Sequence, residues 1–286
     1  MQEYPIDKLV ADFDETVSEE DTISLLVHAA ADSRNDDKSQ FLAAWQEMVE
    51  WYFTRYNRVC NEWLVRRPMA PRHALQDTQY AMLTDFLASF RELELASIQR
   101  VVEQGFLAGV TSERSRAIGR SVVKKPGVDR VLSAIRAAGG EVEILSANWS
   151  AALIEGAMEG LCNQVIANRL EYDATGRSTG NIHLGVVSAQ DKLKHLRERN
   201  YVSVKRKRTG QTLYIGDSIS DFLAILNADL GVLIGSNPTA MQTIERFNLS
   251  AQQLREGTRF NPTQQYQGAI LLIDSWEMLE GFLSTA

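Results

Sequence analysis

Apolar residues recur along this chain with two different spacings, which together predict the order of its elements. Short apolar runs, typical of buried strands, cover residues 6–10, 141–146, 212–216 and 230–234. Helical spacing of the apolar positions fills the segments between these runs, at residues 126–138, 150–161, 188–199 and 220–228. This alternation of strands and helices predicts an α/β fold built on a parallel sheet.

A long helical region separates the first strand from the rest of this alternation. Between residues 17 and 120 the apolar positions follow helical spacing almost throughout, and aromatic residues are dense from residue 41 to residue 65. We expect these helices to form a unit inserted after the first strand, at the carboxyl edge of the sheet. The alternative is that they pack on the sheet as part of its core, because aromatic residues at helical spacing are also typical of core packing.

A β-hairpin is predicted in the second half of the chain. Residues 165–172 and 180–184 flank the turn-forming sequence Asp173-Ala-Thr-Gly176. The pattern leaves open whether this hairpin closes over a site or extends the sheet.

The first strand ends in acidic residues. Asp12 and Asp14 lie two residues apart after the apolar run, and Thr16 follows them. In a strict strand alternate side chains share a face, so both carboxylates are expected to point at the same space. Neighbouring carboxylates repel unless a divalent cation lies between them or one of them keeps a proton and serves as an acid. The alternative is a strand that simply ends in a polar loop.

Three further polar groups follow predicted strands or begin predicted helices. Ser146 and Asn148 come after the second strand, where a hydroxyl and an amide form either an anion site or a helix cap. Lys192 lies early in a helix, where its charge is unfavourable without an anionic partner, although a solvated lysine is the alternative. Asp217 and Asp221 follow the third strand one helical turn apart, so both carboxylates can face the same space.

Composition and charge limit the classes of function. The 286 residues suffice for one large or two modest domains, and the net charge of −7 argues against broad nucleic-acid binding. The basic run Lys205–Arg208 is the exception, and we interpret it as a solvated loop. The two cysteines, Cys60 and Cys162, have no metal-ligand spacing.

The sequence predicts a cytoplasmic protein without a membrane partner, and a nuclear fraction remains compatible with it. No signal-peptide pattern is visible at the N-terminus, and no apolar run has the length that spans a bilayer. The sequence does not indicate an oligomeric state.

Taken in order, the four polar groups resemble the four signature motifs of the haloacid dehalogenase (HAD) superfamily of phosphatases. Asp12-Phe-Asp-Glu-Thr16 resembles the first motif, DxDxT, and Gly216-Asp-Ser-Ile-Ser-Asp221 resembles the last. Ser146 and Lys192 stand where the second and third motifs are expected.

This resemblance implies a division of the chain into two domains. Residues 1–16 and 121–286 are expected to form a Rossmann-like, doubly wound parallel sheet. Residues 17–120 are expected to form an all-helical C1 cap domain, as in phosphoserine-phosphatase-like members of the superfamily.

Several segments are also similar to the phosphatase half of plant two-domain proteins. Those proteins fuse a thiaminase II-like domain to a HAD domain that dephosphorylates thiamin monophosphate. The similar segments include Tyr214–Asp221, Ala228–Ser236 and Trp51–Tyr56. The thiaminase-like half has no counterpart here, and Ser146-Ala-Asn-Trp-Ser150 replaces a cysteine-rich form of the second motif. The resemblance therefore implies the phosphatase chemistry more firmly than the substrate.

The family mechanism implies a role for each motif residue. Asp12 would attack phosphorus and form an aspartyl-phosphate, while Asp14 would protonate the leaving group and then activate water. The residues that would hold Mg²⁺ are Asp12, Asp14 through its backbone carbonyl, Asp217 and Asp221. The residues that would bind substrate are Ser146, Asn148 and Lys192, the last also as a catalytic group.

The predicted function is Mg²⁺-dependent hydrolysis of a small phosphomonoester, with thiamin monophosphate as the first candidate. Phosphoserine, a nucleotide monophosphate, pyridoxal phosphate or a keto-sugar phosphate are alternatives. A hypothesis of another class is a regulator that binds a phosphorylated ligand without hydrolysing it. Glu19, Glu20 and Trp45 are candidates for contact with the leaving group, although a solvated or core role is the alternative for each.

Overall fold

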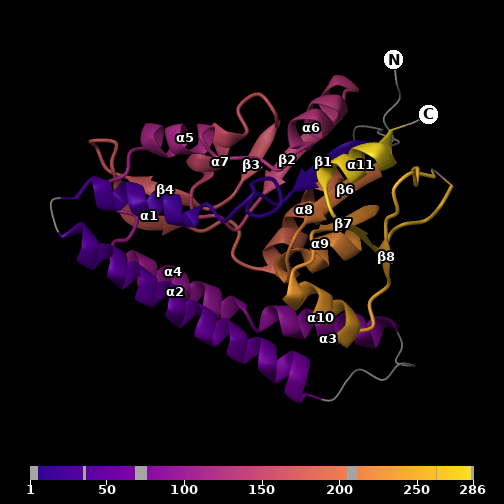
Figure 1. Ribbon diagram of the computed structural model, residues 1–286, viewed down its shortest axis with the longest axis horizontal. Coiled ribbons are helices and arrows are strands. Elements are labelled where there is room, and N and C mark those ends of the chain that lie inside the picture. The colour runs from indigo at the N-terminus through magenta and orange to yellow at the C-terminus, as the bar shows by residue number, and fades with distance from the viewer. Residues whose placement is uncertain (1–5, 35–36, 68–75, 205–210, 262, 285–286) are drawn as a thin grey trace.

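A seven-stranded parallel sheet forms the centre of the computed structural model, with helices above and below it (Figure 1). The structure describes residues 6–34, 37–67, 76–204, 211–261 and 263–284. The strands lie in the order β3-β2-β1-β6-β7-β9-β8, and every adjacent pair is parallel. Their bounds are β1 Ile6–Ala11, β2 Glu141–Leu145, β3 Gln164–Ile166, β6 Gln211–Gly216, β7 Leu230–Ile234, β8 Ala251–Gln253 and β9 Ile270–Ile273.

Helices cover both faces of this sheet, which confirms the predicted α/β class. Alternate side chains of β1 show the two faces: Leu9 and Ala11 belong to one buried cluster, and Val10 between them belongs to the other. Helices α6 (Val128–Ala137) and α11 (Trp276–Leu283) bury their apolar residues in the first cluster. Helices α8 (Ala189–Val204) and α9 (Phe222–Asn227) bury theirs in the second. The central strands are apolar on both sides because neither face meets water.

Among the described residues, five α-helices lie between β1 and residue 120, where the long helical region predicts them (Figure 1). Helix α2 runs alongside α4. A short π-helix, Asn61–Arg66, continues directly from the end of α2. The bounds are α1 Ile23–Asp32, α2 Lys38–Cys60, α3 Gln76–Ala88, α4 Arg91–Glu103 and α5 Ser112–Arg120.

Two of these helices pack directly on the elements around the sheet. Helix α3 places Leu83 and Phe86 in the same buried cluster as Phe222 of α9. Helix α5 crosses α7 (Ala151–Ala157) so closely that a Cβ on Gly119 would lie 1.9 Å from the backbone oxygen of Leu153. Part of the helical region therefore packs as core, and its division from the sheet as a separate cap domain stays a prediction.

The predicted hairpin is present, but it is shorter than expected. Strands β4 (Arg169–Tyr172) and β5 (Ser178–His183) pair antiparallel and form a sheet of their own, so the hairpin does not extend the central sheet. Residues 165 and 166, which we expected in the hairpin, pair with β2 as part of strand β3 instead. Asn168 lies between the two strands, and its Nδ2 donates to Ala147 O at 2.9 Å and to Val186 O at 2.8 Å.

The C-terminal part contains elements that our reading of the sequence did not place. Helix α10 (Pro238–Arg246), the edge strand β8 and strand β9, which lies between β7 and β8, follow β7 in the chain. The apolar run Ile270–Ile273 is the sequence signal that could have predicted β9. The basic run Lys205–Arg208 lies outside the described residues. Among the helices that the structure describes, none has the length and apolar character that crossing a membrane requires.

Candidate active site

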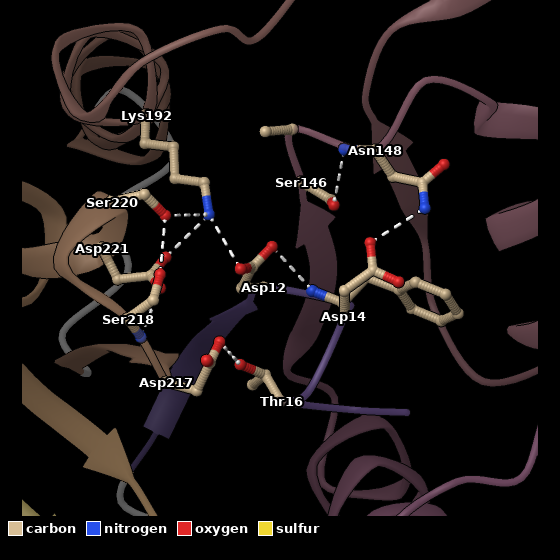
Figure 2. Close-up of polar contacts among 12 residues, drawn as sticks. Asp12, Asp14, Thr16, Ser146, Asn148, Lys192, Asp217, Ser218, Ser220 and Asp221 are labelled. Atoms are coloured by element: carbon tan, nitrogen blue, oxygen red, sulfur yellow. Dashed lines mark hydrogen bonds and ion pairs between the residues drawn. The ribbon is translucent and has the colours of Figure 1, made fainter. Parts of the chain in front are cut away.

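The motif residues meet at the carboxyl ends of the central strands. Strand β1 lies between β2 and β6, so Asp12 at its end is flanked by Ser146 after β2 and by Asp217 after β6. Lys192 reaches the same place from α8. Figure 2 shows Lys192 and Asp217 on one side of Asp12, and Ser146 on the other. The topology thus brings together residues that are up to about two hundred positions apart, as for ligand sites of open parallel sheets.

Asp12 is held in a fixed orientation inside the protein. The residue is 6% exposed, and its backbone N–H continues the sheet by donating to Ile215 O at 2.9 Å. Its Oδ1 accepts a hydrogen bond of 2.8 Å from the backbone N–H of Phe13. Its Oδ2 lies 2.9 Å from Lys192 Nζ. Burial raises the pKa of Asp12 to about 7, although the charge of Lys192 acts in the opposite direction.

Lys192 is a buried cation rather than a solvated one. Its Nζ lies 2.7 Å from Asp221 Oδ1 as well as 2.9 Å from Asp12 Oδ2, and its residue is 1% exposed. Burial acts to lower the pKa of Lys192, but the carboxylates of Asp12 and Asp221 outweigh it and raise the pKa above its ordinary value. Lys192 therefore stays charged, and it is the counter-ion of the carboxylates of Asp12 and Asp221.

Asp221 is completely buried and its oxygens are already occupied. Its Oδ1 accepts from Lys192 Nζ and from the Tyr214 hydroxyl, both at 2.7 Å. Its Oδ2 accepts from the backbone N–H and the hydroxyl of Ser218, at 3.2 and 3.3 Å. With four donors in place, Asp221 positions Lys192 more readily than it could serve as a direct metal ligand.

Asp14 points away from the other carboxylates, which differs from what a strict strand predicts. Strand β1 ends at Ala11, and the turn that follows has a positive φ of 56° at Glu15. Thr22 donates to Asp14 Oδ1 from its backbone N–H at 2.9 Å and its hydroxyl at 2.6 Å. Asn148 Nδ2 donates to Asp14 Oδ2 at 2.8 Å. Burial raises the pKa of Asp14, while these hydrogen bonds act to lower it.

Three carboxylates lie close enough together to surround a metal ion, with Asp221 in a supporting position beside Asp12 and Asp217. Among the described residues, one oxygen each of Asp12, Asp217 and Asp221 lies within 4.8 Å of the others. Burial raises the pKa of Asp217 to about 8, and the Thr16 hydroxyl donates to its Oδ1 at 3.0 Å. The raised pKa values of Asp12 and Asp217 reflect buried negative charge that the single positive charge of Lys192 does not balance. Hard oxygen ligands with excess negative charge suit Mg²⁺, so the residues present fit that ion.

Ser146 and Asn148 have different local roles. Ser146 Oγ accepts from the backbone N–H of Asn148 at 3.1 Å and borders the cavity. The side-chain cap of helix α7 comes from Ser150, whose Oγ accepts from Leu153 N at 3.3 Å, so neither Ser146 nor Asn148 caps the helix. Asn148 instead orients Asp14.

A cavity of about 580 Å³ lies over this cluster of polar residues. The strand ends supply its floor, and helices α2 and α4 supply aromatic and acidic side chains to the part farther from the sheet. Trp45 is among the lining residues, whereas Glu19 and Glu20 are exposed and are not. The lining residues that the sequence did not single out include Asp21, Tyr52, Tyr56, Phe90 and Glu94.

Comparison with known proteins gives one family and a set of distant relatives. A family model described as haloacid dehalogenase-like hydrolase matches residues 54–225. The chain is 23% identical, over 96% of its length and 48% of the relative's, to "Bifunctional TH2 protein, mitochondrial" of Arabidopsis thaliana. It is 26% identical, over 83% of its length and 85% of the relative's, to a CTO1 family protein of Schizosaccharomyces pombe. The chain thus spans about half the length of the first relative and most of the second.

A solved structure supports the fold. The structure of a phospho-aspartyl intermediate analogue of phosphoserine phosphatase matches with a TM-score of 0.53 at 15% identity, over 99% of this chain and 100% of that one. At this identity the likeness concerns the fold alone. The family model begins at residue 54, so the position of Asp12 and Asp14 in the site rests on the geometry described above.

Proposed function

Because this chain belongs to the haloacid dehalogenase-like hydrolase family, we propose that it is a phosphatase that hydrolyses a small phosphomonoester through an aspartyl-phosphate on Asp12. The observation that carries this proposal is the position of Asp12. Its buried carboxylate lies on the cavity floor beside Lys192, held by the Phe13 N–H, and is ready to attack. The membership in the HAD family that the sequence motifs indicate is confirmed.

Asp12 supplies the nucleophile in this reaction. One of its oxygens forms a bond to phosphorus, and the bond between phosphorus and the ester oxygen breaks. In the second step a water molecule attacks phosphorus, releases phosphate and restores the carboxylate of Asp12. Lys192 and Ser146 border the cavity beside Asp12, where they would bind phosphoryl oxygens and stabilise the charge that develops on them.

Asp14 is the proposed acid and base. Its raised pKa favours a proton on the carboxyl group, which passes to the ester oxygen as the alcohol leaves. The resulting carboxylate then takes a proton from the attacking water. Thr22 and Asn148 fix the orientation of Asp14 through three hydrogen bonds, so we assign Asn148 a positioning role within the substrate site.

Mg²⁺ is the proposed cofactor. Asp12, Asp217 and the backbone carbonyl of Asp14 would hold it, with Asp221 beside them as the residue that orients Lys192. When bound, the ion would neutralise charge on the phosphoryl group.

We propose that residues 17–120 act as the cap that selects the leaving group, since α2 and α4 line the cavity beyond the floor. Thiamin monophosphate is the first candidate substrate. Two observations support it: the sequence similarity to the phosphatase half of plant two-domain proteins, and the aromatic side chains of the cavity, which suit a flat cationic ring. Other small phosphates remain the alternatives, and a cytoplasmic location remains a prediction.

The test is a phosphate-release screen over a panel of small phosphomonoesters, with and without Mg²⁺. The panel includes thiamin monophosphate, phosphoserine, pyridoxal phosphate, a nucleotide monophosphate and p-nitrophenyl phosphate. We expect Mg²⁺-dependent release that the substitution Asp12→Asn abolishes. Binding of these esters with no release from any of them would instead favour a regulator that recognises phosphorylated ligands.

A further inference from the structure

The cavity beyond the catalytic floor has an unusual combination of side chains. Its walls carry the aromatic rings of Trp45, Tyr52, Phe53, Tyr56 and Phe90. Several of these rings pack against one another, with centroids 5.1 Å apart for Tyr56 and Phe90 and 6.0 Å apart for Tyr52 and Tyr56. Among these rings, one acidic side chain, Glu94 of α4, also lines the cavity.

One oxygen of the Glu94 carboxylate accepts a hydrogen bond from the described residues, and the other does not. The Tyr52 hydroxyl of α2 donates to Glu94 Oε1 at 2.6 Å. Among the residues that the structure describes, Tyr52 is the only hydrogen-bond donor to the Glu94 carboxylate, so Glu94 Oε2 has no donor there. Burial raises the pKa of Glu94 to about 7, which agrees with a carboxylate that lacks a counter-ion. The helices thus present a fixed acceptor to the cavity.

The cavity provides no cation to pair with Glu94. Of the described residues that line it, Lys192 is the one cationic side chain, and its Nζ is already paired with Asp12 and Asp221. Asp21 and Glu15 add further negative charge to the lining. A leaving group with its own carboxylate would meet repulsion here, whereas a positive charge would find both a carboxylate and the faces of aromatic rings.

Resting on the proposed phosphatase function, we propose that Glu94, oriented by Tyr52, is a specificity-determining residue that binds a positive charge on the leaving alcohol. The substrate class is then the phosphomonoesters of cationic nitrogenous alcohols. Glu94 acts on the leaving group and takes no part in bond making or breaking at phosphorus. The alternative is a purely structural role, in which Glu94 only accepts the hydrogen bond from Tyr52 that joins α4 to α2.

The test compares esters with cationic and neutral leaving groups in matched variants. The probes are thiamin monophosphate and phosphocholine, which carry a cation, and p-nitrophenyl phosphate, which does not. Glu94→Gln keeps the size of the side chain and an acceptor for Tyr52 while removing the charge. Glu92→Gln is the control, because Glu92 is exposed on the same helix and is not among the lining residues.

We expect wild-type protein to prefer at least one cationic ester by kcat/KM. Glu94→Gln should reduce kcat/KM for that ester by about 30-fold or more, mainly through KM, because a buried charge pair loses one partner. Its rate on p-nitrophenyl phosphate should change by less than about threefold, which also shows that the variant folds. Glu92→Gln should match wild type on every probe.

Tyr52→Phe separates a specificity role from a structural one. It removes the interhelical hydrogen bond but leaves the charge of Glu94, so the preference for the cationic ester should largely persist. The proposal is overturned if wild type shows no preference for cationic esters, if Glu94→Gln slows both kinds of ester equally, or if Tyr52→Phe loses the preference as fully as Glu94→Gln. In each of these cases the phosphatase function would still stand if the wild-type protein hydrolyses an ester and Asp12→Asn abolishes that hydrolysis. If the wild-type protein hydrolyses none of the esters, the phosphatase function itself is removed.

Discussion

The floor and the wall of the cavity are built on different principles. On the floor, the charged side chains bind one another: Lys192 pairs with two carboxylates, and Asp14 accepts three hydrogen bonds. On the wall formed by α2 and α4, Glu94 accepts a hydrogen bond from Tyr52 and shares the lining of the cavity with aromatic residues. The difference suggests that the floor is preorganised for one reaction, while the wall is left open for the substrate to complete.

The largest expected effect comes from the floor itself. Asp12→Asn removes the nucleophile while keeping the size of the side chain and an acceptor for the Phe13 N–H. We expect kcat to fall by about 10⁴-fold or more on every ester, since removal of a nucleophile is not compensated by binding. Steady-state kinetics measure this, with thermal melting as the control for folding. A variant that keeps full activity would remove Asp12 from the mechanism.

Lys192→Met tests whether the floor depends on its one cation. The substitution leaves Asp12 and Asp221 buried without their partner, and we expect a loss of about 3–5 kcal/mol in the free energy of unfolding. Urea denaturation measures it. Lys194→Met on the same helix is the control: its side chain is 70% exposed, and we expect a change of less than about 0.5 kcal/mol. Equal stabilities for the two variants would contradict the assigned role of Lys192.

Asp14→Asn tests the division of labour between the two aspartates. We expect a loss of about 100-fold in kcat/KM, which reports the first step, on an alkyl phosphate, whose leaving alkoxide needs a proton. On p-nitrophenyl phosphate the loss should be smaller, because that leaving group departs as a stable anion. Comparing kcat/KM for the two esters measures the difference. Equal losses on both would mean that Asp14 does not act as the acid.

The smallest expected effect concerns Mg²⁺ and stability. Burial raises the pKa of Asp12 to about 7 and that of Asp217 to about 8, from an ordinary value of 3.8. Between pH 3.8 and about pH 8 the metal-free folded protein therefore binds more protons than the unfolded chain. Its stability therefore falls as pH rises through that window.

Mg²⁺ binds the ionised carboxylates and should offset this loss at the upper end of the window. We expect Mg²⁺ to raise Tm by about 5 °C more at pH 8 than at pH 5. Differential scanning calorimetry at the two pH values measures the difference, and Asp217→Asn should reduce it. The same increment at both pH values would argue against these carboxylates as the metal site.

Much of the floor is predictable from sequence because its residues follow strands. Asp12, Ser146 and Asp217 each come directly after an apolar run, and parallel strands bring their carboxyl ends to one edge. The exact direction of Asp14 is not predictable, since it depends on where β1 stops and on a donor, Thr22, that resembles a helix cap in the sequence.

The wall is far less visible in the sequence. Glu94 lies among charged neighbours on a helix, in a pattern that equally describes a solvated face. Its position in the cavity depends on how α4 packs against α2, which is a tertiary contact rather than a local preference. Tyr52 and Phe90 likewise follow helical spacing, which predicts core packing and ligand contact equally.

The central claim is that Asp12 becomes covalently phosphorylated during turnover. In the most direct measurement, the protein is mixed with Mg²⁺ and an ester that it hydrolyses, and the reaction is quenched with acid within the first turnovers. Mass spectrometry of peptides then locates the phosphoryl group. We expect the group on Asp12 in wild type, and more of it in Asp14→Asn, where the second step lacks its base. Turnover with no phosphoryl group on Asp12 in either protein would contradict the account.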